Sequence, residues 1–141
     1  ENGYGIVMPP EIDPGALPAT RATLEMIAKL DVHCVIPGHS EPFADVDSAL
    51  DRAFRRTDAF AADPLRMARH VVRVLLLFAL LDQERMPLAS LPQYMERVGV
   101  YREFNARFFQ IEPAALAETL VSELEAAGAV RRADGWLIPA R

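Results

Sequence analysis

The sequence predicts an α/β segment followed by a mainly helical domain that ends in a β-hairpin. Over residues 1–62 the elements follow the order strand, helix, strand, which is typical of an α/β layer. At Asp63 and Pro64 the chain restarts as a helix, because aspartate caps a helix and proline fits its first turn. Near the C-terminal end, Asp134-Gly135 separates two short apolar segments, as a hairpin turn requires. We therefore expect one domain over residues 1–62 and a second over residues 63–141.

The first part of the chain is predicted to contain two strands and two helices. Tyr4–Met8 is a short apolar segment that Pro9-Pro10 must end, because proline has no N–H for a strand ladder. His33–Ile36 is mostly apolar and β-branched, which favours a strand buried on both faces and makes Cys34 a small buried hydrophobe. Helices are expected over residues 18–30 and from Asp45 or Asp47 to Ala62.

The second part is predicted to be a set of helices with short connections. The first helix runs from Pro64 to about Leu81 and is expected to be the central helix of a second core. Its predicted inward-facing stripe is Met67, His70, Val71, Val74, Leu75, Phe78 and Leu81. Further helices are expected over residues 88–98, 101–109 and 113–127, with Gly99 ending the first and Gly128 following the last. Helices followed by a terminal hairpin form the outline of a winged helix.

Composition and charge exclude several classes of protein. Of the 141 residues, 51% are hydrophobic and 25% are charged, which excludes a disordered or fibrous chain. The net charge of −5 argues against nucleic acid as a partner, because phosphates require a basic surface. The longest apolar run, Val71–Leu81, is shorter than the roughly 20 residues of a membrane span. Cys34 has no internal disulfide partner and no secretion signal is evident, so we expect a cytoplasmic protein.

The chain by itself offers no complete set of metal ligands. Its three histidines, His33, His39 and His70, are not spaced to bind a metal from one helical turn or from alternate positions of a strand. A catalytic zinc ion needs three protein ligands and an open position. A nucleophile elbow, a phosphate-binding glycine loop and a Cys-x-x-Cys pair are also absent from the sequence.

The segment Val35-Ile36-Pro37-Gly38-His39-Ser40 joins a predicted strand to a turn that presents one imidazole. It resembles the last metal-binding motif of the metallo-β-lactamase-fold hydrolases, usually Pro-Gly-His-Gly, with Ser40 in place of the final glycine. Upstream, residues 1–10 resemble the segment that follows the metal-bridging aspartate of that family. Downstream, Asp63-Pro64, Arg69-His70 and the run at 74–76 resemble the linker helix to an appended winged-helix domain. The resemblance covers nearly the whole chain.

The resemblance implies that the chain is a C-terminal fragment of a larger hydrolase with an αββα core. The signature His-x-His-x-Asp-His, a third histidine ligand and the bridging aspartate have no counterpart here, and the chain opens with Glu1 rather than methionine. By the resemblance, His39 is a metal ligand and His70 is a candidate for the border of the substrate cleft. The intact parent is expected to hold two zinc ions and to act on a small ester-type substrate. The fragment is expected to bind no zinc, to contain no complete catalytic site and to be inactive.

The two histidines also have simpler structural interpretations, and the chain has one alternative function. His39 can be an ordinary loop histidine, and His70 can be a packed histidine on the apolar side of a helix. The chain can also be a non-catalytic winged-helix module for interaction or dimerisation. Weak nucleic-acid binding is disfavoured, because the helix over residues 113–127 carries three glutamates and no Lys or Arg. Arg131 and Arg132 on the hairpin are too few to compensate.

The expected partners follow from the same interpretation. The first is the N-terminal hydrolase half of the parent. The second is another copy of the chain, because strands around Ile6-Val7 and Val35-Ile36 would have unpaired edges that self-association can cover. No membrane is expected as a partner.

Overall fold

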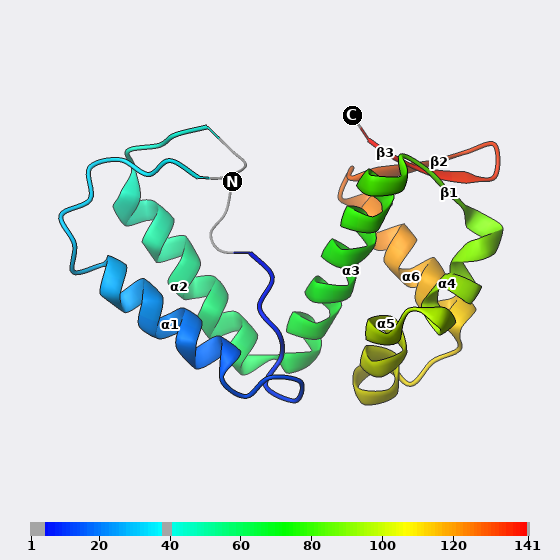
Figure 1. Ribbon diagram of the computed structural model, residues 1–141, viewed down its shortest axis with the longest axis horizontal. Helices are drawn as coiled ribbons and strands as arrows, with labels where there is room; N and C mark the ends of the chain where they lie inside the picture. Colours follow the sequence, from blue (N-terminus) through cyan, green and yellow to red (C-terminus); the bar gives the residue numbers. More distant parts are fainter. Residues whose placement is uncertain (1–4, 38–40, 141) are drawn as a thin grey trace. The chain divides into compact units, whose positions relative to one another are not determined.

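The structure, a computed structural model, describes residues 5–37 and 41–140 (Figure 1). These residues form six α-helices and one small three-stranded antiparallel sheet, so the described chain is mainly helical. The chain divides into two compact units, Glu1–Met67 and Ala68–Arg141. The division falls inside helix α3 (Pro64–Gln83), near its first turn.

The first unit is built on two helices that pack against each other, α1 (Ala16–Ile27) and α2 (Val46–Ala62) (Figure 1). Asp45 caps α2, since its carboxylate accepts a hydrogen bond from the N–H of Ser48 at 3.4 Å. An ion pair between Arg21 and Asp58 joins the two helices at the surface. The interior contains a small cluster of buried side chains with Val7 packed against it: Leu17, Phe60 and Met67. The predicted start and end of α2 are therefore confirmed.

The two strands predicted in the first unit do not form as predicted. Residues 5–8 of the first are not in a strand, and Tyr4 lies outside the described residues. In the second, Val35 alone is paired, in an isolated antiparallel bridge with Phe43. Cys34 is exposed and Ile36 is 82% exposed, so the prediction of a segment buried on both faces is wrong. A strand needs neighbouring strands, and within the described part of the chain Phe43 is the only residue that pairs with this segment.

Helix α3 begins where the Asp63-Pro64 pair predicts, but its predicted inward face is only partly correct. Within the second unit the fully buried positions recur mostly every four residues: Ala68, Val71, Val72, Leu76 and Leu80. Phe78 and Leu81, which were predicted to face inward, are 56% and 54% exposed. The helix is apolar around most of its circumference over 71–81, so periodicity alone does not select one face. No helix in the described part of the chain is long and apolar enough to cross a bilayer.

The sheet of the second unit has the order β1-β3-β2, with β1 at Met86–Pro87, β2 at Val130–Ala133 and β3 at Trp136–Pro139. The β2–β3 hairpin is confirmed, and Asp134 and Gly135 at its turn have φ angles of 50° and 80°. Strand β1 was not predicted. It pairs with β3 through Met86 opposite Leu137, which places Leu137 in the central strand with no exposed surface.

The remaining helices complete the second core. A 3₁₀ turn, η1 (Leu88–Ser90), leads into α4 (Leu91–Arg97), and α5 (Gly99–Phe104) continues into a π-helical turn, η2 (Asn105–Phe109). Gly99 was predicted to end the helix over residues 88–98, but it is the first residue of α5. The extended backbone of Val98 separates α4 from α5. Helix α6 (Pro113–Ala126) is followed by Gly128 at φ 69°, as predicted. These helices and the sheet bury a common set of side chains: Leu91, Met95, Tyr101, Phe104, Leu116, Leu120, Val121, Leu124 and Val130.

The N-cap of α3 gives a direct test of the helix-start prediction. Asp63 Oδ1 accepts a hydrogen bond from the backbone N–H of Arg66 at 2.9 Å. Because this bond satisfies a free N–H in the first turn, we expect Asp63→Ala to lower the free energy of unfolding by about 1 kcal/mol. Urea unfolding followed by circular dichroism measures the change. The matched control is Asp51→Ala, an exposed aspartate inside α2, which should shift the free energy by less than about 0.5 kcal/mol. Equal losses in the two variants would contradict the capping role.

Candidate functional site

The two residues that flank the segment predicted to carry a metal ligand are joined by an antiparallel bridge. The N–H of Val35 donates to the carbonyl oxygen of Phe43 at 2.9 Å, and the N–H of Phe43 donates to the carbonyl oxygen of Val35 at 3.0 Å. Phe43 lies shortly before the start of α2. His39, the predicted ligand, falls between Val35 and Phe43 in the sequence but lies outside the described residues, so its role stays a prediction.

The same bridge forms one wall of a cavity in the first unit. Its volume is about 220 Å³, and every side chain that lines it is apolar: Leu24, Ile27, Val35, Phe43, Val46, Ala49, Leu50 and Ala53. Such a lining offers no side-chain ligand for a metal and no acid or base. The cavity can therefore accept an apolar side chain but can carry out no chemistry of its own.

The other two histidines do not add to a site among the described residues. The side chain of His33 is 85% exposed, and its Nε2 lies 3.5 Å from Asp31 Oδ2. His70 is half-buried on α3 in the second unit. Over residues 5–37 and 41–140, no group of three or more His, Cys, Asp or Glu side chains is arranged to hold a metal ion. One imidazole does not meet the three-ligand requirement of a catalytic zinc, so the described residues do not fit a complete metal site.

In the second unit, the hairpin arginine that was considered as a phosphate contact is bound to the protein itself. Arg132 donates to Glu118 at 2.6 and 3.0 Å, to Glu125 at 3.2 Å and to Ser122 at 3.0 Å. The hydrogen bond from Arg132 lowers the pKa of Glu118, with a second contribution from Ser122. Arg132 thus joins the hairpin to side chains of α6.

Two of the arginines on α3 are used in the same way. Arg69 Nε lies 3.6 Å from Glu123 Oε1, and Arg73 Nη1 lies 3.4 Å from Glu123 Oε2. Arg66, Arg69 and Arg73 recur at spacings of three and four residues, which places them on one side of the helix. The anion that Arg69 and Arg73 meet is a carboxylate of α6, so these two residues join α3 to α6.

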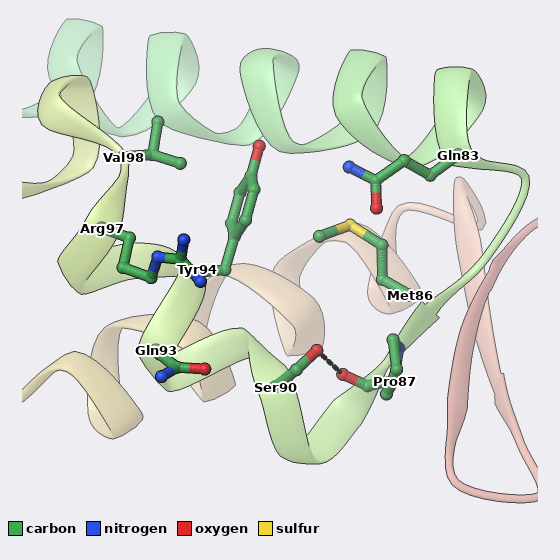
Figure 2. Close-up of a pocket in the computed structure, with 8 residues that line it drawn as sticks. All are labelled: Gln83, Met86, Pro87, Ser90, Gln93, Tyr94, Arg97 and Val98. Atoms are coloured by element: carbon green, nitrogen blue, oxygen red, sulfur yellow. Dashed lines mark hydrogen bonds between the residues drawn. The ribbon is translucent and has the colours of Figure 1, made fainter.

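A second cavity, which the sequence analysis did not find, lies in the second unit between the end of α3, β1, η1 and α4 (Figure 2). Its volume is about 470 Å³. Both polar and apolar side chains line it: Gln83, Met86, Pro87, Ser90, Gln93, Tyr94, Arg97 and Val98. The Ser90 hydroxyl donates to the carbonyl oxygen of Pro87 at 2.9 Å, which fixes the turn at one end. The spacing of Gln93 and Arg97 places both on one side of α4, but the sequence has no signal that brings α3 and β1 beside them.

Comparison with models of protein families, with curated proteins and with solved structures gives no significant match to this chain.

Proposed function

We propose that this chain is the C-terminal portion of a metal-dependent, di-zinc hydrolase of the metallo-β-lactamase superfamily. In this proposal residues 1–62 complete an αββα hydrolase domain, and residues 63–141 form its appended winged-helix-like domain. The observation that supports the proposal is the antiparallel bridge between Val35 and Phe43, two residues that flank the Pro37-Gly38-His39 motif in the sequence and precede α2. Loops at strand ends are where α/β proteins gather their ligands.

In this function His39 contributes one imidazole ligand, and the other ligands come from the N-terminal half of the longer protein. In this proposal the fragment itself is inactive, because the other ligands belong to the longer protein. When bound, the metal ions lower the pKa of a coordinated water and polarise the bond that is cleaved. A small ester-type molecule is the proposed substrate class of the parent, with His70 as a candidate for the border of its cleft.

Exposed apolar surface on the first unit supports the presence of a further structural layer. Met26, Leu30 and Ile36 are 58%, 60% and 82% exposed, and the cavity beside the Val35–Phe43 bridge is lined by apolar side chains alone. Large apolar side chains that are exposed beside an open apolar cavity favour a contact with another part of a protein. In this proposal the occupant is the N-terminal part of the hydrolase domain, whose sheet would give Val35 strand neighbours besides Phe43.

A second candidate function, a non-catalytic packing or dimerisation module, is favoured by the second unit. In this proposal its helices, its three-stranded sheet of order β1-β3-β2 and its hairpin form a winged-helix-like domain. Arg69, Arg73 and Arg132 pair with glutamates of α6 and are not free for phosphates. A winged-helix outline without a basic surface is better suited to contacts with protein than to contacts with DNA.

Replacing His39 in the longer protein distinguishes the two functions. We expect the unaltered protein to hold two zinc ions per chain and His39→Ala to hold fewer, as measured by atomic emission. Hydrolysis of p-nitrophenyl acetate should fall by more than about 100-fold. Replacing a residue that merely hydrogen-bonds to a metal ligand already lowers activity by up to about 100-fold, and His39 is proposed to be a ligand itself.

The control is His33→Ala, which removes an exposed imidazole six positions away in the sequence. This variant should keep the zinc content and the activity of the unaltered protein. Equal zinc content in His39→Ala and the unaltered protein would contradict the ligand role. A longer protein without zinc would exclude the hydrolase and leave the packing module.

A further inference from the structure

The cavity between α3, β1 and α4 is lined by an arginine that has no ion-pair partner among the residues that the structure describes. Arg97 lies in the last turn of α4 and lines the cavity. In the described part of the chain no carboxylate lies within ion-pair distance of Arg97, whereas Arg69, Arg73 and Arg132 are paired with glutamates. An arginine at the wall of a cavity without a protein partner is available to an anionic ligand.

Two glutamine side chains also line the cavity, one at the end of α3 and one on α4 (Figure 2). Gln93 precedes Arg97 by four residues, so both side chains lie on one side of α4, and Gln83 comes from the end of α3. Neither amide has a hydrogen-bond partner within the protein among the described residues. Each amide offers two donors and one acceptor oxygen. The cavity therefore has more hydrogen-bonding groups than the protein itself uses.

The remaining walls suit a flat apolar group. Met86 is 3% exposed, and Tyr94 and Val98 are half-buried. The Tyr94 ring packs against the ring of Tyr101, with centroids 5.5 Å apart, and this contact holds it in place. Figure 2 shows the side chains of Gln83, Met86 and Tyr94 pointing toward one another. Aromatic rings and thioethers both pack favourably on a flat ring.

We propose that this cavity binds a small organic anion with a flat apolar body, with the anion at Arg97 and the body against Tyr94 and Met86. The volume of about 470 Å³ lies within the range of small-molecule sites. A peptide strand added to the sheet edge is a poorer occupant, because β1 has only two residues and Pro87 has no N–H to donate. The proposal uses none of the residues of the proposed hydrolase function and stands independently of it.

The test is an NMR titration of the ¹⁵N-labelled chain with benzoate, phenyl phosphate and benzyl alcohol. We expect at least one of the two anions to bind three- to tenfold more tightly than the neutral alcohol, the range for a partly exposed charge pair. The side-chain amide signals of Gln83 and Gln93 should shift together with the backbone signal of Arg97. The comparison of benzoate with phenyl phosphate shows whether a carboxylate or a phosphate is preferred.

Variants separate this site from non-specific attraction. Arg97→Gln should remove the preference for the anions and leave the binding of benzyl alcohol unchanged. Gln93→Glu should have the same effect, because it places a carboxylate four residues before Arg97. The control Arg131→Gln removes an exposed cation on β2, outside the cavity, and should retain the preference. Anion preference that persists in Arg97→Gln, or an absence of shifts at Gln83 and Gln93 with all three probes at millimolar concentration, would overturn the proposal.

Discussion

Raising the pH above about 10 should destabilise the second unit, because Tyr101 must remain neutral in its interior. The side chain of Tyr101 is 1% exposed, and this burial is the main cause of a pKa raised well above its ordinary value. The charge of Tyr94 and a hydrogen bond with its side chain raise the pKa of Tyr101 further. Deprotonation of Tyr101 is therefore much less favourable in the folded state than in the unfolded chain.

The direction of the pH dependence follows from this difference. The unfolded chain releases the Tyr101 proton near pH 10, while the folded protein keeps it. The contribution of Tyr101 to the free energy of unfolding is at its full value below pH 10. It is lost as the pH rises from 10 toward the raised pKa of Tyr101 in the folded state. In that window the free energy of unfolding should fall by about 1.4 kcal/mol per pH unit.

Urea unfolding at several pH values between 8 and 12 measures this loss, with the emission maximum of Trp136, the only tryptophan, as the reporter. Tyr101→Phe is the matched variant. It should cost about 1 kcal/mol at pH 8 through the lost hydrogen bond, and its stability should depend much less on alkaline pH. A decline of the same slope in Tyr101→Phe and in the unaltered chain would show that another group is responsible.

Helix starts and turns were predictable because their signals are local. Asp45 and Asp63 cap α2 and α3, since a carboxylate next to free N–H groups stabilises a helix start in almost any context. Gly128 and Asp134-Gly135 adopt the positive φ angles that their residue types favour. Each of these features depends on residues within about four positions, and a single sequence contains all of that information.

Strands and buried faces were less predictable, because they depend on partners that are distant in the sequence. Val35 pairs only with Phe43 within the described residues, so apolar β-branched composition was not sufficient to make a strand over 33–36. The pairing of Met86 with Leu137 joins segments some fifty positions apart and made β1 a strand of only two residues. On α3, apolar side chains extend around most of the helix, so the sequence pattern does not show which side faces the core. The packing of the folded protein decides this, and it leaves Phe78 exposed.

The candidate sites show the same limit. A short motif was enough to single out His39, which remains a prediction because it lies outside the described residues. The ion pairs of Arg132 with Glu118 and Glu125 were not predictable from the number of charged residues, because such a count does not show which arginines are paired. The cavity at Arg97 depends on α3, β1 and α4 meeting in space, and no spacing along the chain encodes that meeting.

Truncating the central strand of the sheet should produce a large loss of stability. Leu137 has no exposed surface and lies in β3, between Met86 of β1 and Arg132 of β2. Leu137→Ala removes three carbon atoms from a closely packed interior and leaves a void that the paired strands cannot easily close. We expect the free energy of unfolding to fall by about 2–5 kcal/mol, measured by urea unfolding with circular dichroism.

The matched control lies one residue further along the same strand. Ile138 points to the opposite face of β3 and is half-buried, so Ile138→Ala should cost about 1 kcal/mol while changing β-propensity in a similar way. Because alternation along a strand sends neighbouring side chains to opposite faces, the difference between these variants measures burial rather than strand formation. A larger loss for Ile138→Ala than for Leu137→Ala would show that the buried face of the sheet is the other one, and the register of β3 against β1 would be wrong by one residue.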